Sequence, residues 1–339
     1  MRKLWLHIGA QRTATTSLQS FLFRNPGPLN RAGYLYPFGV ERHKGVIDGL
    51  LARELAVEDF AADLQRRADG KEYPIHSVVM SEEGTSLRQD LSVLTRLRDH
   101  FDLRVIYTLR RQDRWLESWY FQNVKWQWNP ALSQITFAGF MARRAEFHWI
   151  NYDRYVYRLE RVFGPENIEL IRFERAHMRG GPVGEFARRI GLDPDRFEAL
   201  GFLPPRHENA SYSPAMAEFV RRLPIGIGSD DIRAALTDAC AAVDRKVLGH
   251  SGKSSELLLP PDQRAALMAE YAPGNQALAR RWFGCDRLFD EPYPEPDTPL
   301  AEMILPAETD SLMDRFVAPL IAELAALGAL TRPNSPEKP

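Results

Sequence analysis

The segment at residues 4–19 constrains the fold of this chain more than any other. An apolar run at residues 4–8, L-W-L-H-I, has the composition of a buried strand, and a turn of small and polar residues follows it. Residues 15–17, T-T-S, then open a helix with an apolar face, and their hydroxyls are expected to cap it. A strand, a tight turn and a helix N-terminus form an anion site, because free N–H groups and the helix dipole point at the bound group. The sequence therefore predicts a phosphate-binding loop.

The loop differs from the phosphate loop of nucleotide kinases and ATPases. That loop reads G-x-x-x-x-G-K-[ST], and its Lys reaches the terminal phosphates. Here Gly9 is followed five residues later by Ala14 and then by Thr15 in place of the Lys. The cation is instead Arg12, earlier in the loop. Because Ala carries a Cβ, position 14 is expected to avoid positive φ.

The segment H-I-G-A-Q-R-T-A-T-T-S-L-Q resembles the 5′-phosphosulfate loop of bacterial carbohydrate-type sulfotransferases, which typically reads H-I-G-x-x-K-T-G-T-T-S-L-Q. Arg12 replaces the family's Lys, and Ala14 replaces its Gly. Arg always carries a charge and binds sulfate or phosphate in a fork, so the resemblance implies charge stabilisation by Arg12 and not proton donation. The implied donor is 3′-phosphoadenosine 5′-phosphosulfate (PAPS). The residues implied to bind it are Gln11, Arg12, Thr13, Ala14, Thr15, Thr16 and Ser17.

A second strand–helix junction supports the same resemblance. Residues 103–109, L-R-V-I-Y-T-L, are a buried strand that leads to Arg110 and to a helix expected at about 115–125. Sulfotransferases place an Arg at the end of such a strand and a Ser eight residues later, and the two bind the 3′-phosphate of PAPS. Arg110 and Ser118 have that spacing. Lys253 is a further candidate, by likeness to a late basic loop that closes over the donor in some relatives.

The order of elements predicts an α/β fold with a P-loop-like central parallel sheet flanked by helices and mainly helical C-terminal additions. Strands are expected at about 3–8, 77–81, 103–109 and 167–173. Later helices are expected at about 182–191, 213–223, 231–248, 261–272 and 274–283. We expect an α/β domain over residues 1–290 with a helical insertion at about 40–70. Residues 291–339 are expected to form a Pro-rich tail with one helix near 309–328 and disordered last residues.

Sulfuryl transfer to a hydroxyl needs a base for the hydroxyl proton, and ligands of open α/β sheets collect at the carboxyl ends of the strands. Ser81-Glu82-Glu83-Gly84 follows the strand at 77–81. Bacterial relatives show an S-x-E pattern there, which makes Glu83 the first candidate base. Glu82 is the second, because a strand end can direct either side chain inward. Histidine is the base in other branches, so His7, His43 and His148 are alternatives, although a core role is commoner for a residue placed like His7.

Composition sets the remaining expectations. The chain has 44 Lys and Arg and 45 Asp and Glu, so its formal net charge of −1 gives no support for nucleic-acid binding. No apolar run approaches the roughly 18 residues of a membrane span, and the first strand begins too early for a signal peptide, so a cytoplasmic location is expected. The two cysteines and eight histidines show no metal-ligand spacing, so no metal is expected.

The resemblance implies a carbohydrate, glycolipid or small metabolite as the acceptor. A non-catalytic relative that binds nucleotide or glycan and an atypical P-loop kinase are the two alternatives. The oligomeric state is not indicated.

Overall fold

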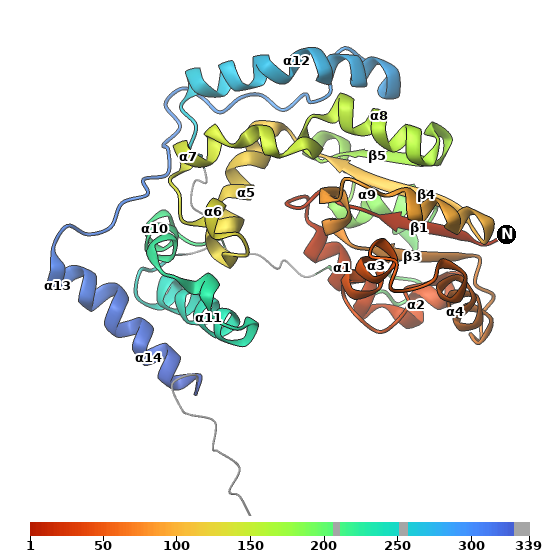
Figure 1. Ribbon diagram of the computed structural model, residues 1–339, viewed down its shortest axis with the longest axis horizontal. Coiled ribbons are helices and arrows are strands. Elements are labelled where there is room, and N and C mark those ends of the chain that lie inside the picture. The colour runs from red at the N-terminus through yellow and green to blue at the C-terminus, as the bar shows by residue number, and fades with distance from the viewer. Residues whose placement is uncertain (206–210, 251–256, 329–339) are drawn as a thin grey trace, which may run out of the picture. The chain divides into compact units, whose positions relative to one another are not determined.

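The computed structural model describes residues 1–205, 211–250 and 257–328. Two compact units share the chain (Figure 1). The first, here called the sheet unit, contains residues 1–112, 147–208 and 266–293. The second, here called the helical unit, contains residues 113–146, 209–265 and 294–339.

The sheet unit is built on five parallel strands in the order β2-β3-β1-β4-β5. Their bounds are β1 Lys3–His7, β2 Tyr34–Leu35, β3 Ser77–Ser81, β4 Asp102–Leu109 and β5 Ile168–Arg172. In the register of the central strands, His7 lies opposite Ser81 on one side and Ile106 on the other. Because the strands are parallel, their carboxyl ends meet at one edge, where ligands of open α/β sheets bind.

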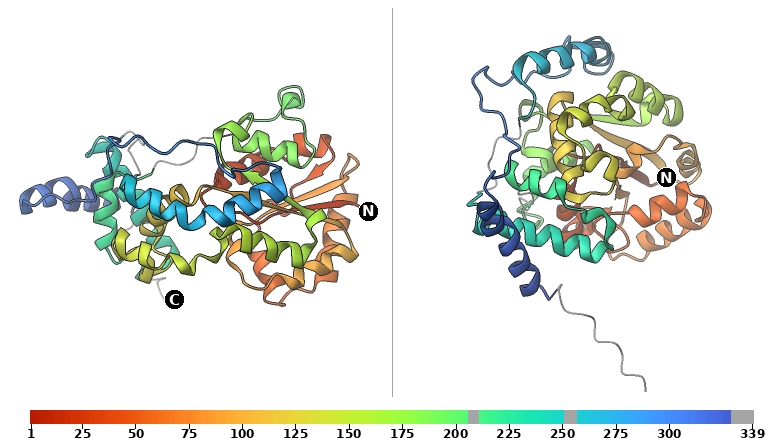
Figure 2. Two further views of the ribbon diagram at one scale, coloured as in Figure 1. Left: turned by 90° about the horizontal axis from the view of Figure 1, so that it is seen from above. Right: turned by 60° about the vertical axis from the view of Figure 1, so that its left-hand side comes forward.

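Helices cover both faces of the sheet. On one face, Trp5, Val79 and Ile106 pack with Phe21 and Phe186 in a single apolar core. The helices of that layer are α1 Thr15–Arg24, α2 Pro26–Arg31 and α9 Gly181–Arg189. On the opposite face, the ring of Tyr107 contacts two tyrosines of α8 Tyr152–Phe163. Also in the sheet unit are α3 Lys44–Leu51, α4 Val57–Asp69 and a 3₁₀ segment at Ser92–Asp99 that contacts β4 (Figure 2).

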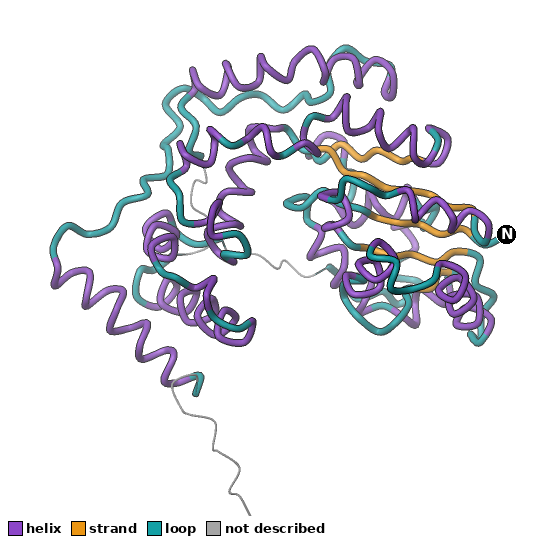
Figure 3. The backbone as a smooth tube through the Cα atoms, viewed as in Figure 1, coloured by secondary structure: helices purple, strands orange, loops and turns teal. Residues whose placement is uncertain are grey.

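The remaining elements are helices, and the described residues after β5 form no strand (Figure 3). Helix α5 Gln112–Trp126 begins at the last residue of a sheet-unit segment, and α12 Pro261–Phe283 passes from the helical unit into the sheet unit. The others are α6 Pro130–Ser133, α7 Phe137–Ala142, α10 Pro214–Arg222, α11 Asp230–Lys246, α13 Thr309–Leu312 and α14 Ala318–Ala326. Within the described ranges, no helix has both the length and the apolarity needed to cross a bilayer.

The fold class expected from the sequence is confirmed: a central parallel sheet flanked by helices, with helical additions after it. Two details differ. The two-residue strand β2 was not expected, because two residues are too few for a periodic pattern. A break at Pro273 was expected, yet α12 continues through it. The buried side chains before the proline (Leu267, Met268) and after it (Leu278, Ala279) favour one continuous helix over the local penalty of the proline.

Candidate functional site

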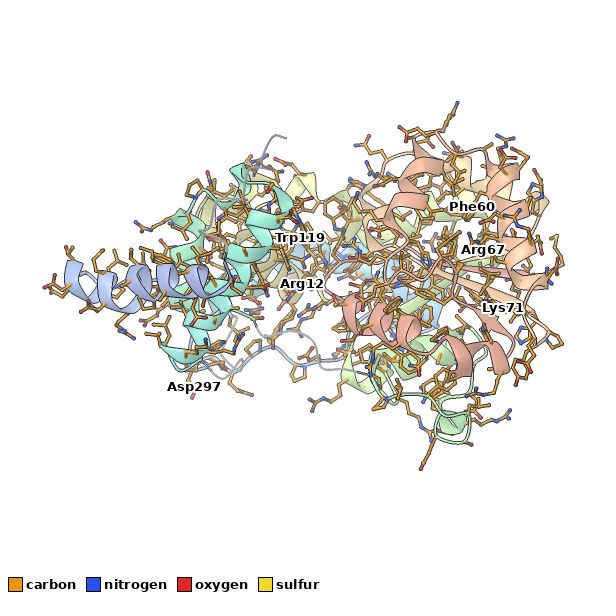
Figure 4. The ribbon with its side chains drawn as sticks, turned by 90° about the horizontal axis from the view of Figure 1, so that it is seen from below. Arg12, Phe60, Arg67, Lys71, Trp119 and Asp297 are labelled. Carbon is orange, nitrogen blue, oxygen red and sulfur yellow. The ribbon has the colours of Figure 1, made fainter. Side chains whose placement is uncertain are left out.

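The loop after β1 has an unusual backbone. Gly9 has φ 108°, Arg12 has φ 64° and Ala14 has φ 59°. Thr13 Oγ1 donates a hydrogen bond to the carbonyl of Ala10 (2.6 Å) and so closes the turn. Left-handed residues in a turn allow successive N–H groups to converge on a bound anion. Arg12 is labelled in Figure 4.

The expectation that Ala14 avoids positive φ is therefore wrong. Its φ of 59° and ψ of 30° are left-handed, and this conformation costs a residue with a Cβ about 1–2 kcal/mol. Such strain persists only where the surroundings impose it, and it is often found at functional sites. The family's Gly would adopt the same conformation without that cost.

Helix α1 lacks the side-chain cap that its sequence suggested. Its N-cap is Ala14, which has no polar side chain, and no hydroxyl of the first turn takes its place. Among the described residues, no acceptor is found for the N–H groups of Thr15, Thr16 and Ser17. Thr16 is exposed and Ser17 is half-buried, so this end of the helix is open to solvent. Unpaired N–H groups at a helix N-terminus are suited to binding an anion, and the binding of phosphate here stays a prediction.

Glu83 lies directly against this loop. A Cβ added to Gly9 would come 3.0 Å from the backbone oxygen of Glu83 and 3.1 Å from its Cβ. Position 9 favours glycine for two reasons: a Cβ would crowd Glu83, and the backbone has a φ of 108°. The first candidate base is therefore in contact with the predicted anion loop.

The Gly9–Glu83 contact makes a testable prediction about stability. We expect Gly9→Ala to destabilise the protein by about 1–3 kcal/mol from backbone strain alone, and to displace Glu83. Urea unfolding measures the loss. The matched control is Gly45→Ala in α3, where an added Cβ meets nothing within 4 Å and φ is not positive. The control should be neutral or stabilising, and equal stabilities for both variants would contradict the contact.

The carboxylate of Glu83 is held from two sides. Gln19 of α1 donates from Nε2 to Glu83 Oε2 (2.6 Å), and Arg42 Nη2 lies 3.1 Å from Glu83 Oε1. The same Arg42 nitrogen donates to Glu82 Oε1 (2.8 Å). Glu82 and Glu83 are both buried, whereas about two fifths of the Arg42 side chain is exposed (39%). The structure thus brings the two candidate bases together under one guanidinium group.

The histidine candidates differ from the acidic pair. His7 is buried, its Nδ1 lies 2.8 Å from Ser81 Oγ, and burial lowers its pKa to about 4. Ser81 N–H donates to His43 Nδ1 (3.1 Å), His43 Nε2 faces the carbonyl of Pro37 (3.1 Å), and burial lowers the pKa of His43. Both rings are neutral hydrogen-bonded parts of the core. His148 lies in a 3₁₀ turn that contacts the turn beginning at Glu83.

Arg110 also lies beside the loop. Its Nη1 donates to the carbonyl of Arg12 (2.6 Å), and its guanidinium stands 5.5 Å from the centre of the Phe173 ring. Tyr152 of α8 holds the Arg110 backbone through both the N–H and the carbonyl. The resemblance implies that Arg110 binds the 3′-phosphate, which stays a prediction. The structure shows that Arg110 supports the left-handed Arg12 at the centre of the loop.

Two other residues predicted to bind the donor, Ser118 and Lys253, do not belong to the sheet unit. Ser118 lies on α5 in the helical unit and is buried. Its assignment to the 3′-phosphate rests on its spacing from Arg110 and stays a prediction. Lys253 lies outside the described residues. Five residues before Ser118 on α5, the buried Asp113 forms an ion pair with Arg264, which also pairs with Glu117 (2.6 Å).

The sequence did not single out the segment at residues 290–293, which is bound at both its N–H and its carbonyl groups. Glu174, just after β5, accepts hydrogen bonds from the N–H groups of Asp290 (2.9 Å) and Glu291. Arg111 donates to the carbonyls of Glu291 (2.5 Å) and Pro292 (3.1 Å). His177 Nε2 lies 2.9 Å from Asp290 Oδ2 and 3.2 Å from Glu174 Oε2, so three possible metal-ligand atoms meet there. His177 and Asp290 are 113 positions apart in the sequence, so a search for ligand spacing did not find this cluster.

Comparison with known proteins gives similarity to solved structures and to no family or curated sequence. No protein-family model and no curated protein sequence matches the chain. The crystal structure of a sulfotransferase from Alicyclobacillus acidocaldarius is similar, with 18% identity and a TM-score of 0.42. The similarity covers 83% of this chain and 96% of that one.

Proposed function

We propose that this protein is a sulfotransferase that moves the sulfuryl group of PAPS to a hydroxyl of an acceptor. The observation that carries the proposal is the contact between the anion loop and Glu83 through Gly9. An uncapped helix N-terminus and a positioned carboxylate in one place suit a transfer in which an anionic group is held and a hydroxyl is deprotonated. The resemblance of residues 7–19 to the phosphosulfate loop names the group transferred.

In the proposed reaction, the N–H groups of Thr15, Thr16 and Ser17 hold the 5′-phosphosulfate. The acceptor oxygen attacks sulfur while its proton passes to the Glu83 carboxylate. The bond between sulfur and the bridging oxygen breaks, and its electron pair stays on the phosphate of 3′,5′-adenosine bisphosphate. Arg12 stabilises the charge that develops on that oxygen. Gln19 and Arg42 orient Glu83 for the proton transfer.

The nucleotide preference tests the proposal first. We expect 3′,5′-adenosine bisphosphate to raise the melting temperature, and AMP and ATP to do so far less, because only the bisphosphate carries the 3′-phosphate. Ligand at a hundred times its dissociation constant stabilises by about 2.7 kcal/mol. Equal or greater stabilisation by ATP would indicate the kinase alternative, and no stabilisation by any nucleotide would contradict the proposal.

Arg110→Ala sharpens this experiment. A charge-assisted hydrogen bond contributes about 1.5–3 kcal/mol, so we expect roughly a ten- to hundredfold loss of bisphosphate affinity in calorimetry and little loss for AMP. Equal losses for the two nucleotides would show that Arg110 acts only by supporting the loop at Arg12.

The acceptor is proposed to be a hydroxyl of a carbohydrate, glycolipid or small metabolite, on the strength of the resemblance to carbohydrate-type members. Incubation of cell extracts with PAPS carrying labelled sulfate identifies it directly. Transfer of the label separates a working enzyme from a relative that only binds nucleotide or glycan.

A further inference from the structure

The two adjacent glutamates receive their hydrogen bonds in different ways. Glu82 Oε1 accepts from Arg42 Nη2 (2.8 Å) and from the N–H of Gly84 (2.9 Å). Its other oxygen, Oε2, is buried and has no hydrogen-bond partner in the described part of the chain. The Glu82 side chain is only 2% exposed, so Oε2 is shielded from bulk solvent.

Glu83 shows the opposite pattern. Arg42 lies 3.1 Å from Oε1 and Gln19 donates to Oε2 (2.6 Å), so each oxygen has a donor. An ionised carboxylate shares its charge between two equivalent oxygens, and both are acceptors. A protonated carboxyl has one carbonyl oxygen that accepts and one hydroxyl oxygen that carries the proton. Glu83 therefore has the surroundings of a carboxylate, whereas the unpartnered Oε2 of Glu82 costs less free energy as a neutral hydroxyl than as a charged oxygen.

We propose that Glu82 keeps its proton, on Oε2, at neutral pH, and that Glu83 is consequently the only ionised member of the pair. The role of Glu83 as the base rests on the proposed function, whereas the proton on Glu82 does not. Glu82 is then a positioning residue: its carbonyl oxygen holds Arg42 and the turn at Gly84, and the full charge of Arg42 is left to Glu83.

The charges around the pair agree with a single negative charge. Arg42 is the cation that contacts both glutamates, and the nearby histidines, His7 and His43, have pKa values lowered by burial. Tyr36 also faces the pair, and its pKa is raised by burial and by the charges of Glu83, Glu82 and Glu41, so it stays neutral. Two ionised carboxylates would leave one net negative charge buried beside the loop that is proposed to bind an anion.

Burial and the neighbouring charge also act on Glu82 directly. Desolvation raises the pKa of Glu82, the charge of Glu83 raises it further, and Arg42 opposes both. A carboxyl whose folded-state pKa lies above its unfolded value, about 4.3 for Glu, binds a proton more tightly when folded. Such a carboxyl makes its full contribution to the free energy of unfolding below the unfolded pKa. This contribution is lost as pH rises from the unfolded pKa through the folded-state pKa.

The experiment compares the wild type with Glu82→Gln, because Gln has the shape of the protonated acid and does not titrate. Urea unfolding from pH 4.5 to pH 8 gives the folding constant of each protein. We expect the folding constant of the wild type, divided by that of the variant, to fall as pH rises. The total fall is tenfold for each pH unit by which the folded-state pKa of Glu82 exceeds its unfolded value. A ratio that rises or stays constant with pH would overturn the proposal, and the exposed Glu54→Gln serves as the matched control.

A second measurement does not require any variant to fold. The infrared spectrum of the wild type at pH 7 should contain the carbonyl stretch of a protonated carboxyl group, and its absence would overturn the proposal. Neither measurement uses a nucleotide. If these two measurements contradict the proton on Glu82 while the bisphosphate binds normally, the proposed sulfotransferase function still stands. If the bisphosphate does not bind, the proposal of a protonated Glu82 still stands.

Discussion

Glu83→Gln is expected to reduce sulfuryl transfer by about 10²–10⁴-fold, the usual contribution of a positioned base. Gln keeps the shape of the side chain and its contact with Gly9 but does not accept a proton at neutral pH. Binding of 3′,5′-adenosine bisphosphate should change little, because the N–H groups at the start of α1 remain in place. Turnover with labelled PAPS and a saturating acceptor, together with calorimetry on the bisphosphate, separates the two effects.

The control for this variant is Glu54→Gln, an exposed glutamate of the sheet unit. The pH–rate profile adds a second check, since the acidic limb of the wild-type profile should disappear with the base. Should Glu83→Gln retain near-wild-type turnover, the acidic pair is structural. His148, whose turn contacts the turn at Glu83, would then be the next candidate.

Arg12→Ala should lower turnover by about 10²–10³-fold, comparable to the loss of one preorganised donor at a developing oxyanion. Arg12→Lys should keep much of the activity, because it keeps the charge and restores the family's residue. Both substitutions leave the Arg12 carbonyl, and hence its hydrogen bond from Arg110, in place. Neither side chain relieves the left-handed backbone at φ 64°, so the difference between the two variants reports on the side-chain charge.

Steady-state turnover and thermal unfolding of both Arg12 variants check this prediction. Equal unfolding temperatures establish that the loop is intact. A Lys variant as inactive as the Ala variant would show that transfer needs the two-pronged geometry of a guanidinium group and not the charge alone.

Strands β1, β3, β4 and β5 were predictable to within about one residue at each end because each is a buried apolar run, whereas the two-residue β2 was missed. Strand β4, for example, was expected at 103–109 and extends over Asp102–Leu109. In a parallel sheet buried on both faces, such runs are the main local signal. The same reasoning placed the loop at the carboxyl end of β1 and the acidic pair at the carboxyl end of β3, at one edge of the sheet.

The conformation of the loop was not predictable from residue preferences. Ala disfavours positive φ, yet Ala14 adopts it because the surrounding turn imposes it. The hydroxyls of the first turn are good caps by composition, but the residue at the N-cap position is Ala14 itself. Local propensity is a weak guide where tertiary contacts and ligand binding determine the backbone.

The residues that hold Glu83 were also missed, for a different reason. Gln19 is 64 residues from Glu83 along the chain, and Arg42 comes from the segment before α3. Gln19 ends the loop motif and Arg42 precedes His43, but nothing in the sequence links either of them to Glu83. Only the pairing of β1 with β3 and the packing of α1 on the sheet bring them to the carboxylates.

The division of the chain between the two units has a consequence for synthesis on the ribosome. All five strands have been made by residue 172, but the sheet unit is completed only by residues 266–293, after the chain has entered the helical unit twice. Until then the buried Arg111 and Glu174 lack the backbone partners that residues 290–292 provide. A fragment that stops before residue 290 therefore lacks these backbone contacts to Arg111 and Glu174.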